Sequence, residues 1–259
     1  MCYDTAQLAY RIYRDAVRTQ ADPEEIKDLF LKWQELEKNN PVQHFHASGF
    51  NHPKLVAFDR KEGKLNVDLH DWGLIPHWVK SEDQAREIWD KTLNARGETI
   101  FEKPSFKEAA EQSRVIIPLD GFYEHHHKHG RTFPHFISRE DGESFLVGGI
   151  RSEWLNTVTG ELLSTVSIVT TKANDLMSEI HNNPKLKEPR MPLLLNDQDS
   201  ETWLSGSQSE VQSLIKPNTE QALKSHTVRR LRGKDYVGNS EEVMEEYHYP
   251  DLNEQTSLF

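Results

Sequence analysis

The chemistry that this sequence offers begins at Cys2, which is its single cysteine. Removal of Met1 would make Cys2 the N-terminal residue, with a thiol and an α-amine on adjacent carbons. The thiol titrates near ~8.5 and an α-amine near ~7.7–8.0, so part of the amine is nucleophilic at neutral pH. Such a pair condenses with an aldehyde to a Schiff base, and thiol attack then closes a thiazolidine ring. A lone cysteine without any role is the simpler explanation until other residues are considered.

Two residues could transfer protons. Glu124 follows an apolar run and Asp120-Gly121 among aromatic residues, where burial would raise the pKa of its carboxyl and suit it to proton transfer near pH 7. His181 lies at the predicted end of a helix over about 173–180, where an imidazole can donate or accept a proton. Each also has an ordinary explanation, namely a strand-edge glutamate that faces water and a helix-capping histidine.

Polar and aromatic residues could bind a ligand. In the loop 93–99, Asn94 could hold a small polar group and Arg96 could bind a phosphate, although a solvated turn with a local ion pair is the common alternative. Trp72 and Trp78 flank a Gly-Leu-Ile-Pro segment, which favours core packing, or a surface on which bases stack at ~1–3 kcal/mol each. The histidines of 125–129 indicate a solvated hairpin tip, so we expect neither a metal site nor a cofactor.

The elements that must position these residues follow from periodicity. Residues 5–40 predict two helices, the second capped by Asp22 with Pro23 in its first turn. Strands and helices then alternate without a regular βαβ rhythm, which favours a single α+β domain. The predicted strands are 54–58, 65–69, 115–119, 133–138, 144–150, 162–170 and 191–195. Further helices are predicted at 83–92, from Ser105 with a capping box to Glu108, at 173–180, and near 197–204 and 208–215.

Composition bounds the location and the partners. The net charge of −11 argues against binding of polyanions by the whole surface and leaves room for a local basic groove. No apolar run predicts a transmembrane helix, and no secretory signal is visible. A single cysteine fits a reducing cytosol. We therefore expect a cytoplasmic protein that binds no membrane.

Several short motifs occur in one order over about residues 1–195, and together they resemble the SRAP family (SOS-response-associated peptidase), whose members shield abasic sites in single-stranded DNA. The motifs are Met1-Cys2; Trp72-Gly73-Leu74-Ile75-Pro76 with Trp78; Asn94-Ala95-Arg96 with Glu98-Thr99; Lys103-Pro104-Ser105-Phe106; Pro118 with Asp120-Gly121-Phe122-Tyr123-Glu124; Thr170-Thr171 with Ala173-Asn174; His181; and Arg190-Met191-Pro192.

The resemblance implies an α+β fold whose barrel-like mixed-sheet core is flanked by helices, in a domain over 1–230. The acidic composition of the residues that follow, with few aliphatic side chains, predicts a loosely ordered tail over 231–259. The resemblance also implies covalent capture of the ring-opened sugar aldehyde by Cys2, together with AP-lyase and autopeptidase activity, by a monomer that is nucleoid-associated when bound to DNA. Asn94 would hold the N-terminal residue or the sugar, Glu124 would shuttle protons, and His181 would assist ring opening and β-elimination. Arg96, Arg190, Trp72 and Trp78 would contact DNA.

The chain departs from the family's pattern in three places. Members usually begin Cys-Gly-Arg, whereas Asp4 stands here where the arginine would bind a phosphate. His125 replaces a tryptophan after Glu124. Residues 182–189 are an insertion between His181 and Arg190. Two other functions use the same residues: an N-terminal-nucleophile peptidase or amidohydrolase with Cys2 as nucleophile, and a non-catalytic nucleic-acid or partner-binding module.

Overall fold

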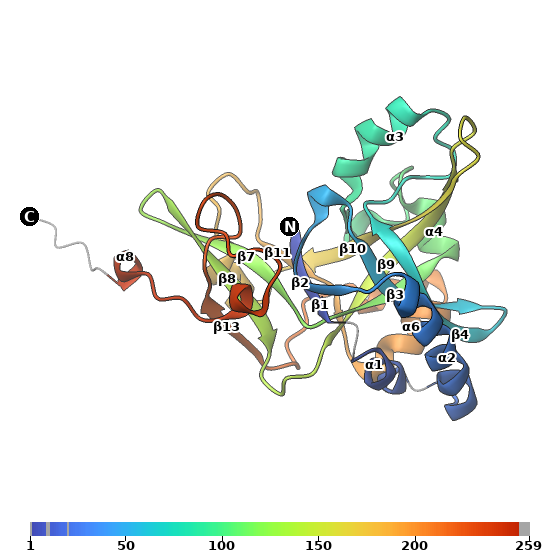
Figure 1. The fold of residues 1–259 in the computed structure, drawn as a ribbon, viewed down its shortest axis with the longest axis horizontal. Coiled ribbons are helices and arrows are strands. Elements are labelled where there is room, and N and C mark those ends of the chain that lie inside the picture. Colours follow the sequence, from blue (N-terminus) through green and yellow to red (C-terminus); the bar gives the residue numbers. More distant parts are fainter. Residues whose placement is uncertain (1, 9–10, 20, 254–259) are drawn as a thin grey trace, which may run out of the picture.

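The structure is a computed structural model that describes residues 2–8, 11–19 and 21–253 (Figure 1). Met1, whose removal the predicted chemistry requires, lies outside the described residues, as do the last six residues of the predicted tail. The described chain forms an α+β fold built on two sheets, with most of its helices around the larger one. The predicted fold class is therefore confirmed.

The centre of the larger sheet is a closed ring of five strands, so this part of the sheet has no free edge. The β10–β4 pair is parallel and the other four pairs are antiparallel. In ring order the strands are β3 (Lys54–Lys61), β4 (Lys64–Trp72), β10 (Leu162–Lys172), β9 (Phe145–Leu155) and β6 (Arg114–Leu119).

Successive residues of β6 serve two different cores because side chains alternate across a strand. Ile116 packs into the hydrophobic cluster that contains Trp33 and Trp203. Its neighbours Val115 and Ile117 pack into the cluster that contains Cys2 and Trp72. All six residues of β6 are consequently buried, which explains why this strand reads as an uninterrupted apolar run in the sequence.

Short strands attached to the ring bring distant segments beside β10. The strand β5 (Asn94–Arg96) runs parallel to β10 with Asn94 opposite Ile168. The strand β11 (Arg190–Pro192) runs antiparallel to it with Arg190 opposite Lys172. A third strand, β12 (Leu194–Leu195), pairs with β9. Two of the predicted site residues thus flank the same half of β10.

The second sheet carries the start of the chain. Its order is β13–β8–β7–β1–β2, and β1 pairs with β7 so that Asp4 is opposite Tyr123. This register brings the residues before Asp4 beside Glu124. The side chain of Gln7 bonds the backbone of Val56 and Pro118 and thereby joins the two sheets. The strands are β1 (Asp4–Leu8), β2 (Gln43–Ser48), β7 (Gly121–Lys128), β8 (Arg131–Arg139) and β13 (Leu223–Thr227).

Most helices cover the ring, whereas α5 packs against β7 of the second sheet and α8 is bonded to the same strand. The longest, α2, begins as the sequence predicts, because Asp22 accepts a hydrogen bond from the Glu24 amide and Pro23 follows it. It packs Ile26, Leu29 and Trp33 toward the core. The helices are α1 (Ile12–Arg18), α2 (Pro23–Asn39), α3 (Glu82–Trp89), α4 (Lys107–Gln112), α5 (Asp175–Ile180), α6 (Ser200–Ser205), α7 (Gln208–Leu214) and α8 (Pro250–Asn253).

Three local predictions are wrong. Residues Asp4–Leu8 form a strand and not the start of a helix, because both neighbouring strands pair with them and all five are buried. The helix α4 has Phe106 at its N-cap, without a side-chain cap from Ser105. The histidines up to 127 belong to β7, and the turn of the hairpin is formed by His129 and Gly130, whose φ angles are 50° and 72°.

The described ranges contain no helix long and apolar enough to span a membrane. Nor do they contain a group of three or more His, Cys, Asp or Glu side chains arranged to hold a metal ion.

Candidate functional site

Cys2 is completely buried at the start of β1, and its surroundings hold it by backbone and side chain. Its carbonyl accepts a 2.7 Å hydrogen bond from Asn94 Nδ2. Its thiol lies 3.8 Å from the carbonyl oxygen of Asp4 and packs with Met177 and Met191. Burial, followed by the negative charge of Glu124, raises the pKa of the thiol well above its ordinary value. The thiol is therefore protonated at neutral pH.

Asn94 has one hydrogen-bonding atom to spare. While its Nδ2 donates to Cys2, its Oδ1 is buried and has no hydrogen-bond donor among the described residues. A buried acceptor without a donor costs about 1–3 kcal/mol. The atom is thus suited to accept a hydrogen bond from a group that arrives beside Cys2, such as an amine or a sugar hydroxyl.

Glu124 and His181 form a buried pair in which Glu124 Oε2 lies 3.8 Å from His181 Nε2. Glu124 comes from β7 and His181 from the C-terminal end of α5. Burial raises the pKa of Glu124 to about 7, and burial lowers the pKa of His181 to about 4. Near neutral pH the carboxyl is therefore close to its midpoint while the imidazole is neutral, which suits both groups to transfer protons.

The insertion does not separate His181 from Arg190. His181 Nδ1 lies 2.8 Å from the Arg190 carbonyl oxygen and 3.2 Å from its amide nitrogen. The shorter contact favours the tautomer in which Nδ1–H donates to the carbonyl, which leaves the Nε2 lone pair on the side of Glu124. Residues 182–189 therefore form a loop whose two ends lie next to each other.

The two arginines that were predicted to bind phosphate, Arg96 and Arg190, form ion pairs with carboxylates. Arg190 is 2% exposed, with Nη2 2.6 Å from Glu98 Oε2 and Nη1 3.1 Å from Glu188 Oε1. The same Glu188 oxygen lies 3.5 Å from Nη1 of the half-exposed Arg96. The sequence suggests an Arg96–Glu98 pair, but Glu98 pairs with Arg190. Glu188, from the insertion, thus bridges both arginines.

We expect Glu188→Gln to strengthen binding of single-stranded DNA by roughly two- to fivefold. The reason is that the DNA no longer has to displace the Glu188 carboxylate from the half-exposed Arg96, an ion pair worth about 0.2–1 kcal/mol. Fluorescence anisotropy titration at fixed salt measures the change. The control is Glu161→Gln, which removes the same charge from an exposed position immediately before β10. An equal gain in both variants would mean that the effect is only one of net charge.

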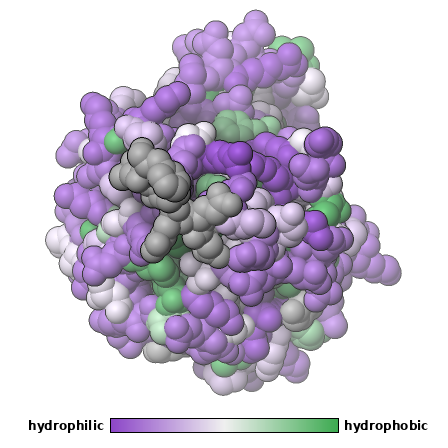
Figure 2. Space-filling view, turned by 90° about the vertical axis from the view of Figure 1, so that its left-hand side faces the viewer, coloured by the Kyte–Doolittle hydropathy of each residue, from purple (hydrophilic) through white to green (hydrophobic). Residues whose placement is uncertain are grey.

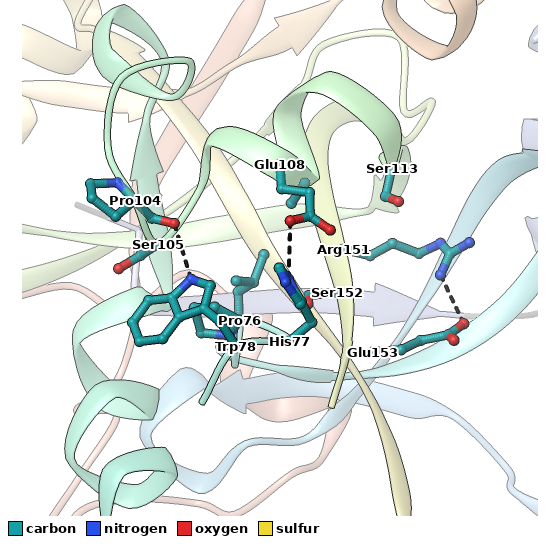
Figure 3. A pocket seen from close by; sticks show the side chains of 12 residues that line it. Pro76, His77, Trp78, Pro104, Ser105, Glu108, Ser113, Arg151, Ser152 and Glu153 are labelled. Atoms are coloured by element: carbon teal, nitrogen blue, oxygen red, sulfur yellow. Dashed lines mark hydrogen bonds and ion pairs between the residues drawn. The ribbon is translucent and has the colours of Figure 1, made fainter. Parts of the chain in front are cut away.

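The two tryptophans lie in different environments. Trp72 is 0% exposed and donates from Nε1 to the Leu93 carbonyl, so it supports the segment before β5 and has no ring face free for a base. Trp78 is 46% exposed and lines a surface cavity of about 270 Å³ beside α4 (Figure 3). Charges on the wall of this cavity are paired within it, as His77 with Glu108 and Arg151 with Glu153. The cavity therefore has no surplus of positive charge for phosphate.

The sequence reasoning missed the partners of Asp4. Its carboxylate lies 2.9 Å from His46 Nε2, and Arg232 Nη2 donates to both of its oxygens at 2.9 and 3.0 Å. Although burial opposes it, the hydrogen bond from His46 and the charge of Arg232 hold the pKa of Asp4 below its ordinary value. The basic run 229–234 is visible in the sequence, but its position against Asp4 depends on the fold.

The chain is similar to known proteins in both sequence and fold. The sequence profile of the family described as "SOS response associated peptidase (SRAP)" matches residues 15–234. The chain is 36% identical over 231 residues to "Abasic site processing protein YoqW" of Bacillus subtilis, covering 85% of this chain and 97% of that protein. It is 31% identical to "Abasic site processing protein HMCES" of Gallus gallus, covering 62% and 55%. A crystal structure of a protein from Bacteroides thetaiotaomicron superposes with a TM-score of 0.79 at 31% identity, covering 95% and 100%.

Proposed function

The chain belongs to the SOS response associated peptidase (SRAP) family, and from that membership we propose that it processes abasic sites in DNA by covalent capture at Cys2. The main support for this proposal is that polar side chains from distant segments lie around Cys2. Asn94 binds its carbonyl, and the Glu124 carboxylate is near enough to raise the pKa of its thiol. His181 in turn faces Glu124.

The proposed reaction uses Cys2 after Met1 has been removed. The α-amine adds to the C1′ aldehyde of the ring-opened sugar, and loss of one water gives a Schiff base. The Cys2 sulfur then adds to the imine carbon, so that a C–S bond forms and the thiol proton passes to the nitrogen. The product is a thiazolidine, and the sum is aldehyde plus aminothiol giving thiazolidine plus water. No oxidant or metal enters this balance.

Glu124 and His181 would move the protons. Loss of water from the carbinolamine needs an acid, and addition of the thiol needs a base. A carboxyl whose pKa is about 7 can serve as both within one cycle. The neutral His181 can accept a proton during sugar ring opening. From the Schiff base, the same pair could remove the C2′ proton and so eliminate the 3′ phosphate, which is AP-lyase chemistry.

Single-stranded DNA is the proposed substrate. Cys2, Glu124 and His181 are all buried, so a reacting sugar must leave the base stack to reach them. Extruding a nucleotide costs a few kcal/mol from a duplex and least from a strand that is already unpaired. We propose that one copy of the chain is sufficient, since every group named in the reaction comes from a single chain.

The alternative function, that of a cysteine peptidase, uses the same residues but requires the Cys2 thiol to be ionised. A cysteine peptidase attacks as the thiolate, whereas burial raises the pKa of Cys2 and keeps it protonated. Condensation in which the amine reacts first is less affected. Turnover of a peptide panel in the absence of any aldehyde would favour the peptidase. Autoprocessing that removes Met1 would be limited to the chain's own N-terminus.

The test is an adduct assay. The processed protein, mixed with single-stranded DNA that contains an aldehyde abasic site, is expected to give a heat-stable shifted band on a denaturing gel. DNA with a tetrahydrofuran analogue lacks the aldehyde and is expected to give none. Duplex DNA with the same lesion is expected to react more slowly. Absence of the band with the aldehyde substrate would contradict the proposal.

A further inference from the structure

A basic segment is attached to the second sheet immediately after β13. It runs from Val228 to Lys234 and contains Arg229, Arg230, Arg232 and Lys234 in a chain whose net charge is −11. Leu231 and Val243 are buried against Tyr123 of β7 and anchor the segment. The backbone of Val228 also bonds to Pro134 and extends the pairing of β13 with β8. In Figure 1 this region lies beside the start of the chain.

Arg232 links the basic segment to the candidate site. It donates to Asp4, two residues after Cys2, and to Ser48 Oγ, while its side chain remains 54% exposed. A buried carboxylate of β1 therefore holds a guanidinium at the surface. Arg232 thus supplies a positive charge near a position where Asp4 alone would repel a phosphate.

Two adjoining cavities continue from this point. The first, of about 210 Å³, is lined by residues that include His125 and Arg232, and His125 directly follows Glu124. The second, of about 510 Å³, is lined by residues that include Arg229, Lys234, one carboxylate (Asp235) and three tyrosines (Tyr236, Tyr247 and Tyr249). Because Arg230 lines both, the two cavities lie next to each other along the basic segment, and we call them together the path.

The path combines free positive charge with aromatic rings. Within the described ranges no carboxylate lies within 4 Å of Arg230 or Lys234, whereas Arg229 is paired with Glu242. The Arg229 guanidinium lies 4.8 Å from the centre of the Tyr247 ring, and Tyr249 donates to the Val228 carbonyl. Cations for phosphates and rings for bases are the two components of single-strand binding sites.

The surroundings also favour a charged polymer over an apolar partner. The side of the molecule that faces the viewer in Figure 2 is hydrophilic over most of its visible area, with small and scattered hydrophobic spots. This is the side on which β13 and α8 lie in Figure 1. A surface of this kind suits a partner that binds through charge and stacking.

We propose that the path from Arg232 through Arg230 to Tyr247 is a subsite for the single-stranded DNA that flanks the abasic nucleotide on one side. The subsite deepens the proposed function and rests on it, since the lesion itself occupies Cys2. Phosphates of the flank bind Arg230, Arg232 and Lys234, and a base stacks on Tyr247 or Tyr249. Arg232 supplies the positive charge that an arginine at position 4 would have supplied.

The test compares two double variants of the full chain that lose the same charge. Arg230→Gln/Lys234→Gln removes the unpaired cations of the path. Lys80→Gln/Arg86→Gln removes two exposed cations near and on α3. Affinity is measured by anisotropy for a long single strand with a central tetrahydrofuran site, at several salt concentrations. For the path variant we expect an affinity loss on the order of tenfold and a salt slope smaller by about 1.4, since each phosphate contact on a single strand contributes about 0.7.

Substrates with shorter or longer DNA beside the abasic site distinguish the proposed subsite from the proposed covalent function. Adduct formation with a trinucleotide that carries the aldehyde site is expected to be the same in the path variant and in wild type, because a trinucleotide does not reach the second cavity. Oligonucleotides extended only on the 5′ or only on the 3′ side are expected to lose affinity in one of the two cases. Tyr247→Leu is expected to weaken binding to the same extended strand without changing the salt slope.

Equal affinity and equal salt slope in the two double variants would overturn the subsite. So would a path variant that loses adduct with the trinucleotide, because the residues would then act on the reaction and not on the flank. If wild type gives no adduct but binding still depends on Arg230 and Lys234, the covalent function fails while the DNA subsite stands.

Discussion

Cys2→Ala is expected to abolish the heat-stable adduct, with at least a hundredfold lower yield at fixed time. Alanine retains the α-amine but has no sulfur to close the ring, so the reaction stops at a Schiff base that water hydrolyses. Borohydride should still trap this intermediate, because reduction turns the imine into a stable amine. Denaturing gels with and without borohydride measure both outcomes. An undiminished heat-stable adduct in Cys2→Ala would contradict the thiazolidine.

The control for the Cys2 experiment concerns the N-terminus. Intact-mass measurement of the purified protein reports whether Met1 has been removed, and only the processed fraction should react. With Met1 retained, the α-amine belongs to another residue and a five-membered ring with the Cys2 sulfur cannot form. Fully reactive protein that still carries Met1 would contradict the mechanism independently of any substitution. The Cys2→Ala protein is expected to fold, since alanine fits the buried position and costs only the contacts of one sulfur atom.

Glu124→Gln is expected to slow adduct formation by about 10²–10⁴-fold, the usual range for loss of a general acid–base group. In wild type the rate should change with pH near 7, because the pKa of Glu124 is raised to about 7. The variant should lack that inflection. Single-turnover rates between pH 5 and 9 measure it. Glu98→Gln, which removes another partly buried carboxylate, is the matched control and should retain the inflection.

The same substitution should make the protein more stable at alkaline pH. The pKa of Glu124 rises from 4.5 in the unfolded chain to about 7 in the folded one, so the folded state binds the proton more tightly. The contribution of this carboxyl to the free energy of unfolding is then fully present below pH 4.5 and is lost as pH rises through about 7. Glutamine removes this fall, and we expect a gain on the order of 1–3 kcal/mol at pH 8 and little change at pH 4. Urea unfolding at both pH values tests it.

Opposite outcomes separate catalysis from stability at Glu124. A variant that is slower and also less stable at pH 8 would mean that glutamine disturbs the packing, and the rate loss would say nothing of proton transfer. A variant that is more stable and slower supports the assignment. Natural active sites often retain a group that destabilises the fold because the reaction needs it.

The predicted strands and the predicted chemistry were recoverable from sequence to different degrees. Apolar runs such as 115–119 identify β6, because burial on both faces leaves little room for polar residues. The segment Asp4–Leu8 was misassigned because five residues are too few for periodicity to distinguish helix from strand. Its strand pairing depends on β2 and β7, which lie far away in the sequence.

The candidate site also contains residues that the sequence predicts and contacts that it does not predict. Asn94, Glu124 and His181 were named from their local context and from the family's motifs, and the structure brings Asn94 to Cys2 and His181 to Glu124. The pairing of Arg190 with Glu98 could not be predicted, since 92 positions separate them along the chain. Nor could the pairing of Asp4 with Arg232, because 228 positions separate them along the chain.

The loop 182–189 has a consequence for the chain entropy of this fold. Its two ends are fixed beside each other by the contacts between His181 and Arg190. Apart from contacts of the loop itself, such as those of Glu188, a change in its length therefore alters the entropy of closing the loop. That entropy grows slowly, by about 0.6 kcal/mol for each doubling of length. Residues can therefore be gained or lost at this point without moving the imidazole or β11. A loop of different length can thus leave the His181–Glu124 pair in place while changing which charge, such as that of Glu188, pairs with the arginines.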